Sequence, residues 1–248
     1  MGVLMQQLLF KHPFIHKFNP YSRAVFKAMA ACHTAQKGMH VFACNNEQCG
    51  AATIQYHSCG NRHCPNCGGM KREAWVDAQM ADLLPTSYYH TVFTIPHELN
   101  SLVMGNRKWM FKLLFDASSY TLLKIAKDSK FLGATPGIIS VLHTWGQDLS
   151  FHPHIHCIVS GGGINSDGHW QSEKRKNHRF LFPKAIMQKV FKGYFMQQLQ
   201  KAIKHKTIDF SDNERMLTIL NQIRFKKCNV YAFRAKRIYE YNNFKLDK

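Results

Sequence analysis

The most regular alternation of polar and apolar residues lies in residues 150–163, which read S-F-H-P-H-I-H-C-I-V-S-G-G-G. Side chains two apart share one face of a β-strand. The pattern therefore predicts a strand with a core-packing face at Ile155, Cys157 and Val159. The opposite face carries His152, His154 and His156. Imidazole is a common metal ligand, so this face is a candidate metal site, and chance histidines on a solvated face are the alternative. Glycines at 161–163 would end the strand and let a ligand approach the backbone.

The rest of the hydrophobic pattern predicts helices and strands on both sides of this segment. Apolar residues at helical spacing predict helices over residues 3–30, 70–84, 98–128 and 184–203. Runs of β-branched and aromatic residues predict strands over 88–96, 138–145 and 229–233, with a loop at 133–137 and a hairpin turn at 164–170. These elements predict an α+β fold in which helices pack on one side of an antiparallel sheet.

Cysteines cluster early in the chain. Six of the eight fall within residues 32–67, and the chain start does not resemble a secretion signal, so metal binding is favoured over disulfides. The pairs Cys44-x4-Cys49 and Cys64-x2-Cys67 predict one zinc ion held by four thiolates, in a structural role or in a module that docks on DNA. The remaining nearby candidates are Cys59, His63 and Cys32, with His33 and His40 also in reach. A second zinc ion or a different partition of the ligands stays open.

Charge indicates the class of partner. The chain carries 33 lysines and arginines against 15 acidic residues, a formal net charge of +18. This excess favours a polyanion, and nucleic acid is the first expectation, with binding that weakens as salt rises. No apolar run approaches the roughly 18 residues of a membrane span, and no basic amphipathic anchor is evident. We therefore expect a DNA-binding protein with no membrane partner, located in the cytoplasm at the nucleoid.

Basic residues concentrate in two places where DNA contacts are expected. One group lies beside the cysteines and consists of Arg62, Lys71 and Arg72. The other is Lys174, Arg175, Lys176 and Arg179. This second group opens a basic stretch, 171–206, in which phenylalanines and tyrosines are interleaved. Such aromatic side chains can stack on bases while basic ones follow the backbone. The alternative is an amphipathic helix with an aromatic core face and a solvated basic face.

Two of these segments together resemble a known family. Residues 152–163 resemble the His–hydrophobic–His (HUH) motif of rolling-circle nucleases, and more narrowly the transposases of the IS91 insertion-sequence family. The run R-H-C-P-N-C at 62–67 is similar to the zinc-binding module that precedes the nuclease in that family. V-F-T-I-P at 92–96, followed by Glu98, is similar to its first nuclease strand. The implied parts are N-terminal helices at 1–31, a zinc-binding module at 32–84 and an HUH nuclease domain at 85–248 that is incomplete at its C-terminus.

The resemblance also implies a chemistry. The family cleaves and transfers single-stranded DNA at insertion-sequence ends through a phosphotyrosine. Mg²⁺ or Mn²⁺ would be held by His154 and His156, with His152 as the third candidate. The first tyrosine of the family's Y-L-G-R-Y run is matched by Tyr241, the expected nucleophile, whereas Lys245 occupies the second position. We therefore expect a DNA transposase whose activity is impaired by truncation.

Two other functions are compatible with these patterns. The missing second tyrosine favours a zinc-containing protein that binds DNA without cutting it. A histidine-triad nucleotide hydrolase also carries His-x-His-x-His followed by apolar residues, and it would use the middle histidine as nucleophile without a metal. The cysteine module and the positive charge argue against the hydrolase.

Overall fold

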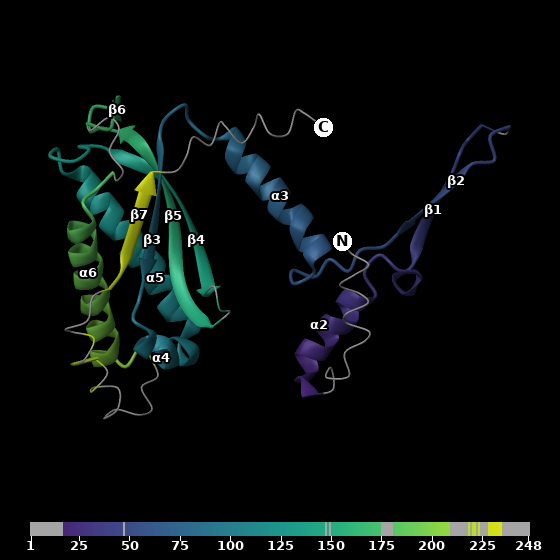
Figure 1. The fold of residues 1–248 in the computed structure, drawn as a ribbon, viewed down its shortest axis with the longest axis horizontal. Coiled ribbons are helices and arrows are strands. Elements are labelled where there is room, and N and C mark those ends of the chain that lie inside the picture. The colour runs from purple at the N-terminus through teal and green to yellow at the C-terminus, as the bar shows by residue number, and fades with distance from the viewer. Residues whose placement is uncertain are drawn as a thin grey trace. The chain divides into compact units, whose positions relative to one another are not determined.

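A computed structural model describes residues 17–46, 48–146, 148, 150–174, 181–208, 218, 220–221, 223 and 228–234. The chain divides into two compact units, with the boundary between Leu83 and Leu84 (Figure 1). We call the first the cysteine unit and the second the sheet unit. Each is described by itself below.

The cysteine unit combines helices with a two-stranded antiparallel hairpin. Its elements are α2 (Pro20–Ala30), the 3-10 helix η2 (Ala35–Lys37), β1 (Met39–Ala43), β2 (Ala52–Tyr56) and α3 (Pro65–Ala81). Helix α3 begins five residues before the predicted start at 70, because Pro65 suits the first helical position, where no N–H is needed. Every residue of both strands is exposed. Among the described residues of this unit, the buried apolar side chains are Ala30, Cys32, Cys64 and Cys67.

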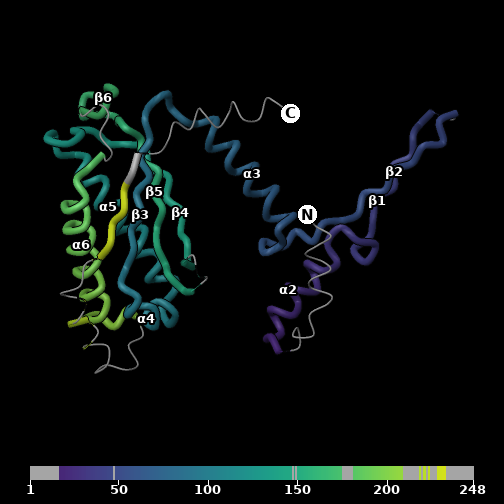
Figure 2. The backbone as a smooth tube through the Cα atoms, viewed as in Figure 1, coloured from purple at the N-terminus to yellow at the C-terminus, as the bar shows by residue number. Residues whose placement is uncertain are grey.

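The sheet unit alternates strands and helices. Its helices are η3 (His97–Leu99), α4 (Asn100–Gly105), α5 (Arg107–Lys127) and α6 (Lys184–Lys204). Its strands are β3 (Tyr88–Thr94), β4 (Thr135–Trp145), β5 (Phe151–Ile164), β6 (Trp170–Ser172) and β7 (Val230–Arg234). The strands form one sheet of order β4-β5-β3-β7, with β6 paired to β5, and every pairing is antiparallel (Figure 2). The loop predicted at 133–137 is shorter, since β4 already begins at Thr135.

Helices α5 and α6 pack on one face of this sheet (Figure 1). The predicted alternation along β5 is confirmed, because Ile155, Cys157 and Val159 are buried in the core that these helices cover. The α+β class is therefore confirmed, with a cysteine module followed by an antiparallel sheet packed by helices. Central strand β5 carries its polar residues on the opposite face, away from α5 and α6.

Helix α6 decides between the two interpretations of the basic, aromatic stretch. Phe191 and Phe195 on α6, and Phe182 just before it, are buried in the core. Lys184 and Lys189 lie on the exposed side. These phenylalanines are therefore packing residues and cannot stack on bases, so the amphipathic-helix interpretation is correct for this part of the stretch.

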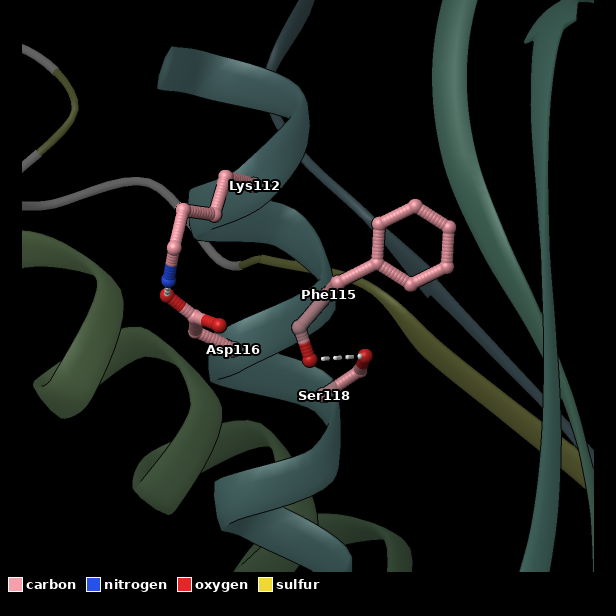
Figure 3. A network of polar contacts seen from close by, with 4 residues as sticks. All are labelled: Lys112, Phe115, Asp116 and Ser118. Carbon is pink, nitrogen blue, oxygen red and sulfur yellow. Dashed lines mark hydrogen bonds and ion pairs between the residues drawn. The ribbon is translucent and has the colours of Figure 1, made fainter. Parts of the chain in front are cut away.

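Helix α5 shows how polar groups are accommodated along a mostly buried helix (Figure 3). On its exposed side Lys112 forms an ion pair with Asp116 one turn later, and solvent screening leaves such an exposed pair with little effect on helix stability. On its buried side the hydroxyl of Ser118 donates to the backbone carbonyl of Phe115 at 3.0 Å. That bond satisfies the hydroxyl within the helix, so Ser118 can face the apolar core.

The glycines at 161–163 have a different role from the one predicted. The strand does not end there but continues to Ile164, and strands rather than a ligand approach the backbone. A Cβ at Gly163 would overlap the carbonyl oxygen of Thr135 on β4. A Cβ at Gly162 would overlap the ring of Trp170 on β6. At this end of β5 the neighbouring strands β4 and β6 approach so closely that residues without side chains are required.

We expect Gly163→Ala to lower the free energy of unfolding of the sheet unit by about 1–3 kcal/mol, because the clash is with backbone and cannot be relieved by a rotamer change. Gly193→Ala is the matched control. Gly193 lies in α6 with nothing near its missing Cβ, so alanine should stabilise by roughly 0.4–1 kcal/mol. Urea denaturation followed by circular dichroism measures both, and equal effects would contradict this account.

Candidate metal centres

Three histidines from neighbouring strands converge on the sheet face opposite α5 and α6, which we call the histidine face. His154 and His156 lie on β5, and the β4–β5 register places His143 directly opposite His154. Each offers one ring nitrogen to a group whose atoms all lie within 4.8 Å of one another. Residues two apart on a strand, and residues opposite each other in an antiparallel pair, point to the same face. Strand geometry alone therefore produces this convergence.

Hydrogen bonds occupy Nδ1 of both β5 histidines of the group and leave Nε2 of each as the candidate ligand atom. Nδ1 of His154 donates to the backbone carbonyl of His152 at 2.6 Å, and Nδ1 of His156 lies 2.7 Å from Nε2 of His90 on β3. Nε2 of His156 is buried and has no hydrogen-bond partner among the described residues. A buried polar atom without a partner is costly, and a metal ion at Nε2 would remove that cost. The three imidazoles therefore fit a divalent transition-metal ion.

The electrostatics of the histidine face favour the neutral forms of His156, His143 and His90. Burial, and then repulsion from the neighbouring imidazoles, lowers the pKa of His156 to about 4. Burial is also the main cause that lowers the pKa of His143 and the pKa of His90. A neutral imidazole has a lone pair that can bind a metal, whereas a protonated one does not. His143 and His156 are therefore in the binding-competent form at neutral pH.

The third member of the group differs from the one predicted. The sequence favours His152, but the ring nitrogens that lie within 4.8 Å of one another belong to His143, His154 and His156, and His152 is not among them. His143 takes the third place, and sequence reasoning missed it. A signal existed, because the predicted strand at 138–145 carries one histidine. Only the pairing register, however, shows that it lies opposite His154.

Four cysteines of the cysteine unit form a second cluster. Their sulfurs all lie within 4.8 Å of one another, and they belong to Cys32, Cys59, Cys64 and Cys67. Sγ of Cys67 lies 3.6 Å from Sγ of Cys32 and 3.7 Å from Sγ of Cys59. A tetrahedral zinc ion with Zn–S bonds of about 2.3 Å would hold its sulfurs about 3.8 Å apart. The cluster therefore has the spacing of a tetrahedral thiolate site for zinc.

The surroundings of this cluster favour bound thiolates. Backbone N–H groups point at the sulfurs, since Cys59 donates to Sγ of Cys32 and Asn61 to Sγ of Cys59, both at 3.4 Å. Burial raises the pKa of Cys32 to about 12. Burial also opposes ionisation of Cys67, but hydrogen bonds from the neighbouring thiols and from the backbone of Gly60 lower its pKa to about 7. The thiolate of Cys67 is therefore easily formed, whereas a bound cation would be needed to ionise Cys32.

The predicted partition of zinc ligands needs correction. Cys64 and Cys67 are together as expected, but Cys44 and Cys49 are not their partners, and Cys32 and Cys59 take those places. The cause is the β1–β2 hairpin. Cys44 and Cys49 flank its turn and are exposed, whereas Cys59 follows the other end of the hairpin. His63 is also exposed and lies outside the cluster, with its Nε2 3.3 Å from Nε of Arg62.

The remaining predicted site residues lie at the surface or outside the described residues. Arg62, Lys71 and Arg72 are exposed at and near the start of α3. Lys174 is exposed after β6, and its Nζ donates to the backbone carbonyl of Ser129. Tyr241 lies outside the described residues, as do Arg175, Lys176 and Arg179.

Comparison with known proteins assigns both units to transposases. Residues 4–95 match the family model described as "Transposase zinc-binding domain", defined on IS91 transposases, and residues 137–245 match the model described as "Putative transposase". The chain belongs to the IS91 transposase family. Its predicted membership is thus confirmed, and the histidine-triad hydrolase is not supported.

Two curated relatives are transposases of the same kind. The "Putative transposase y4qJ" of Sinorhizobium fredii is 40% identical over 203 residues, which are 82% of this chain and 50% of that protein. The "Transposase for insertion sequence element IS801" of Pseudomonas savastanoi pv. phaseolicola is 34% identical over 144 residues, 58% of this chain and 34% of that protein. The IS91-family chain therefore spans half or less of the length of these relatives.

Solved structures of the conjugative relaxase TrwC in complex with oriT DNA show partial similarity. The metal-bound complex is 17% identical, with 44% of this chain and 42% of that chain covered and a TM-score of 0.33. A complex with a 27-mer DNA comprising the recognition hairpin and the cleavage site is 22% identical, with 45% and 44% covered and a TM-score of 0.35. Separately, no helix among the described residues of this IS91-family chain is both long and apolar enough to cross a membrane.

Proposed function

We propose that this chain is the part of an IS91-family transposase that cuts one DNA strand and transfers it, with a metal ion held by His143, His154 and His156. The observation that carries the proposal is the convergence of these three imidazoles on one face of the sheet. Val141 and Tyr231, which the strand register aligns with His156, are both exposed there. A DNA strand could therefore reach the metal position.

The proposed reaction is a transesterification by tyrosine. The hydroxyl of Tyr241 loses its proton, its oxygen attacks the phosphorus of the scissile phosphate, and the leaving 3′ oxygen takes up a proton. The new bond joins the tyrosine to the 5′ side of the DNA, and the broken bond frees a 3′ hydroxyl. When bound, the metal would polarise the scissile phosphate and offset its developing charge. The phosphotyrosine retains the bond energy, so a second 3′ hydroxyl can reverse the step and join the strands.

The three imidazole ligands influence which metal ion the proposed site would bind. Mg²⁺ and Mn²⁺ are the ions expected by resemblance. Three imidazoles are poor partners for Mg²⁺, which prefers carboxylates and water, whereas nitrogen ligands suit transition metals. Of the two expected ions, we therefore propose Mn²⁺ as the one that this site binds. Tighter nitrogen-binding ions such as Ni²⁺ or Zn²⁺ should compete with it.

The cysteine unit would act as the docking part. A zinc ion on the four cysteines would hold the start of α3 rigid. The exposed Arg62, Lys71 and Arg72 would then contact phosphates near it. Lys174 would add a contact from the sheet unit. This arrangement supports single-stranded insertion-sequence ends, at the nucleoid, as the binding partner. The affinity for this DNA should fall steeply as salt rises.

Covalent capture tests the proposed function. The zinc-loaded chain is mixed with Mn²⁺ and an end-labelled single-stranded oligonucleotide carrying the ends of its element, and adducts are resolved on a denaturing gel. We expect an adduct that Tyr241→Phe and metal chelation both abolish.

Tyr231→Phe is the control, because Tyr231 is an exposed tyrosine on the histidine face itself. It should leave the adduct intact. Loss of the adduct in Tyr231→Phe but not in Tyr241→Phe would assign the nucleophile to β7. Salt-sensitive binding with no adduct from any variant would favour the alternative, a zinc-containing protein that binds DNA without cutting it.

A further inference from the structure

His90 on β3 contacts His156 and is not itself in the three-histidine group. Its Nε2 lies 2.7 Å from Nδ1 of His156. The two ring planes differ by only 18°, and their centroids are 4.9 Å apart. The distance between the ring centroids is longer than the distance between the two nitrogens by nearly two ring radii. Both nitrogens therefore lie close to the line that joins the ring centres. The rings therefore meet edge to edge, in the plane where a hydrogen bond to a ring nitrogen is strongest.

The proton in this bond can belong to either ring. If His90 donates, Nδ1 of His156 accepts, and the neutral ring of His156 must carry its proton on Nε2. Nε2 is buried and has no hydrogen-bond partner among the described residues, so that N–H would be unsatisfied and would block metal binding. If His156 donates from Nδ1, its Nε2 instead presents a lone pair to the other two imidazoles. Only the second arrangement leaves an atom that a cation can satisfy.

We propose that His90 is a positioning residue that accepts the Nδ1 proton of His156 and thereby holds the Nε2 lone pair of His156 toward the metal position. His154 is held in the same tautomer by a different acceptor, the backbone carbonyl of His152. The two β5 histidines are thus fixed by one side chain and one peptide group. The inference rests on the proposed metal site, since the lone pair has a purpose only if a cation binds there.

Two substitutions separate the acceptor from the shape of the side chain. His90→Gln places an amide oxygen where the Nε2 acceptor was and should keep the bond to His156. His90→Phe fills the same space with a ring that cannot accept. Outer-shell partners of metal-binding histidines change metal affinity by about 10- to 100-fold when removed. We therefore expect His90→Phe to weaken Mn²⁺ binding by that factor and His90→Gln to restore most of it.

Mn²⁺ affinity is measured on the full zinc-loaded chain from the electron paramagnetic resonance signal of free Mn²⁺, so no DNA cleavage is needed. Wild-type affinity in His90→Phe would overturn the proposal. Equal losses in His90→Phe and His90→Gln would also overturn it, because the acceptor would then not be what matters.

A second readout needs no variant. Nitrogen-15 NMR of the metal-free histidine site in the wild-type chain distinguishes the two tautomers of His156. We expect the form protonated on Nδ1, and a form protonated on Nε2 would overturn the proposal even if Mn²⁺ binds. These results are also distinct from failure of the proposed function. If the chain binds Mn²⁺ with the expected tautomer but forms no DNA adduct, the proposed role of His90 stands and the proposed transposase activity does not.

Discussion

His143→Ala is expected to weaken Mn²⁺ binding by more than about 100-fold, beyond the loss that removal of an outer-shell partner causes, and to abolish covalent capture of DNA. The reason is the small donor set. Three ring nitrogens form the group on the histidine face, and no other described His, Cys, Asp or Glu joins that group. Removing one leaves two donors, which cannot fix the position of an ion against a phosphate. The free Mn²⁺ signal measures the first effect, and the denaturing gel measures the second.

His152→Ala is the matched control. His152 lies on the same strand and was the third ligand expected from the sequence, but its ring is outside the group. Its backbone carbonyl, which accepts from Nδ1 of His154, survives the substitution. Mn²⁺ affinity and adduct yield should therefore stay near wild-type values. A loss in His152→Ala as large as that in His143→Ala would show that the ion sits further along β5 than the geometry indicates.

The contrast between these two histidines shows what the sequence could predict about the site. The period-two pattern of β5 predicts its two faces, since alternation is a local property of a strand. The partner of β5 is not local. The pairing of β4 with β5 contains irregularities between Pro136 and Ile138 and between His143 and Trp145, and a slip of one residue would turn His143 to the opposite face. The place of His143 in the three-histidine group therefore follows from tertiary pairing, which no pattern within residues 138–145 encodes.

The cysteines show the same limit at longer range. Spacing predicted that the sulfurs of Cys64 and Cys67 lie close together, as they do, because two residues between cysteines suit one turn at the start of α3. Spacing also favoured Cys44 and Cys49 as their partners. The structure instead places the sulfurs of Cys32 and Cys59 beside those of Cys64 and Cys67, because the hairpin between residues 39 and 56 carries Cys44 and Cys49 away and returns the chain at Cys59. A hairpin reverses the chain direction. Cysteines that are close in sequence can therefore lie far apart in space, and cysteines further apart in sequence can lie close together.

Cys32→Ser is expected to remove the zinc ion and unfold the cysteine unit. In the described part of this unit the buried apolar side chains are one alanine and three of the four clustered cysteines, so little besides the cluster holds α2, the hairpin and α3 together. Structural zinc sites contribute about 10–16 kcal/mol in small peptides, and exposed two-stranded hairpins are marginal by themselves. Replacing one thiolate with a hydroxyl should therefore cost more than the unit can lose. Elemental analysis measures the zinc content, and limited proteolysis before residue 84 measures the unfolding.

Cys44→Ser separates this account from the partition that spacing alone favours. Cys44 is exposed beside the hairpin turn and takes no part in the four-sulfur group. The variant should keep one zinc ion per chain and resist proteolysis as the wild type does. The two partitions predict opposite results for this substitution, whereas both predict zinc loss in Cys64→Ser. If Cys44→Ser loses its zinc while Cys32→Ser keeps it, the ion is held across the hairpin, and the four-sulfur group of Cys32, Cys59, Cys64 and Cys67 is not the zinc site.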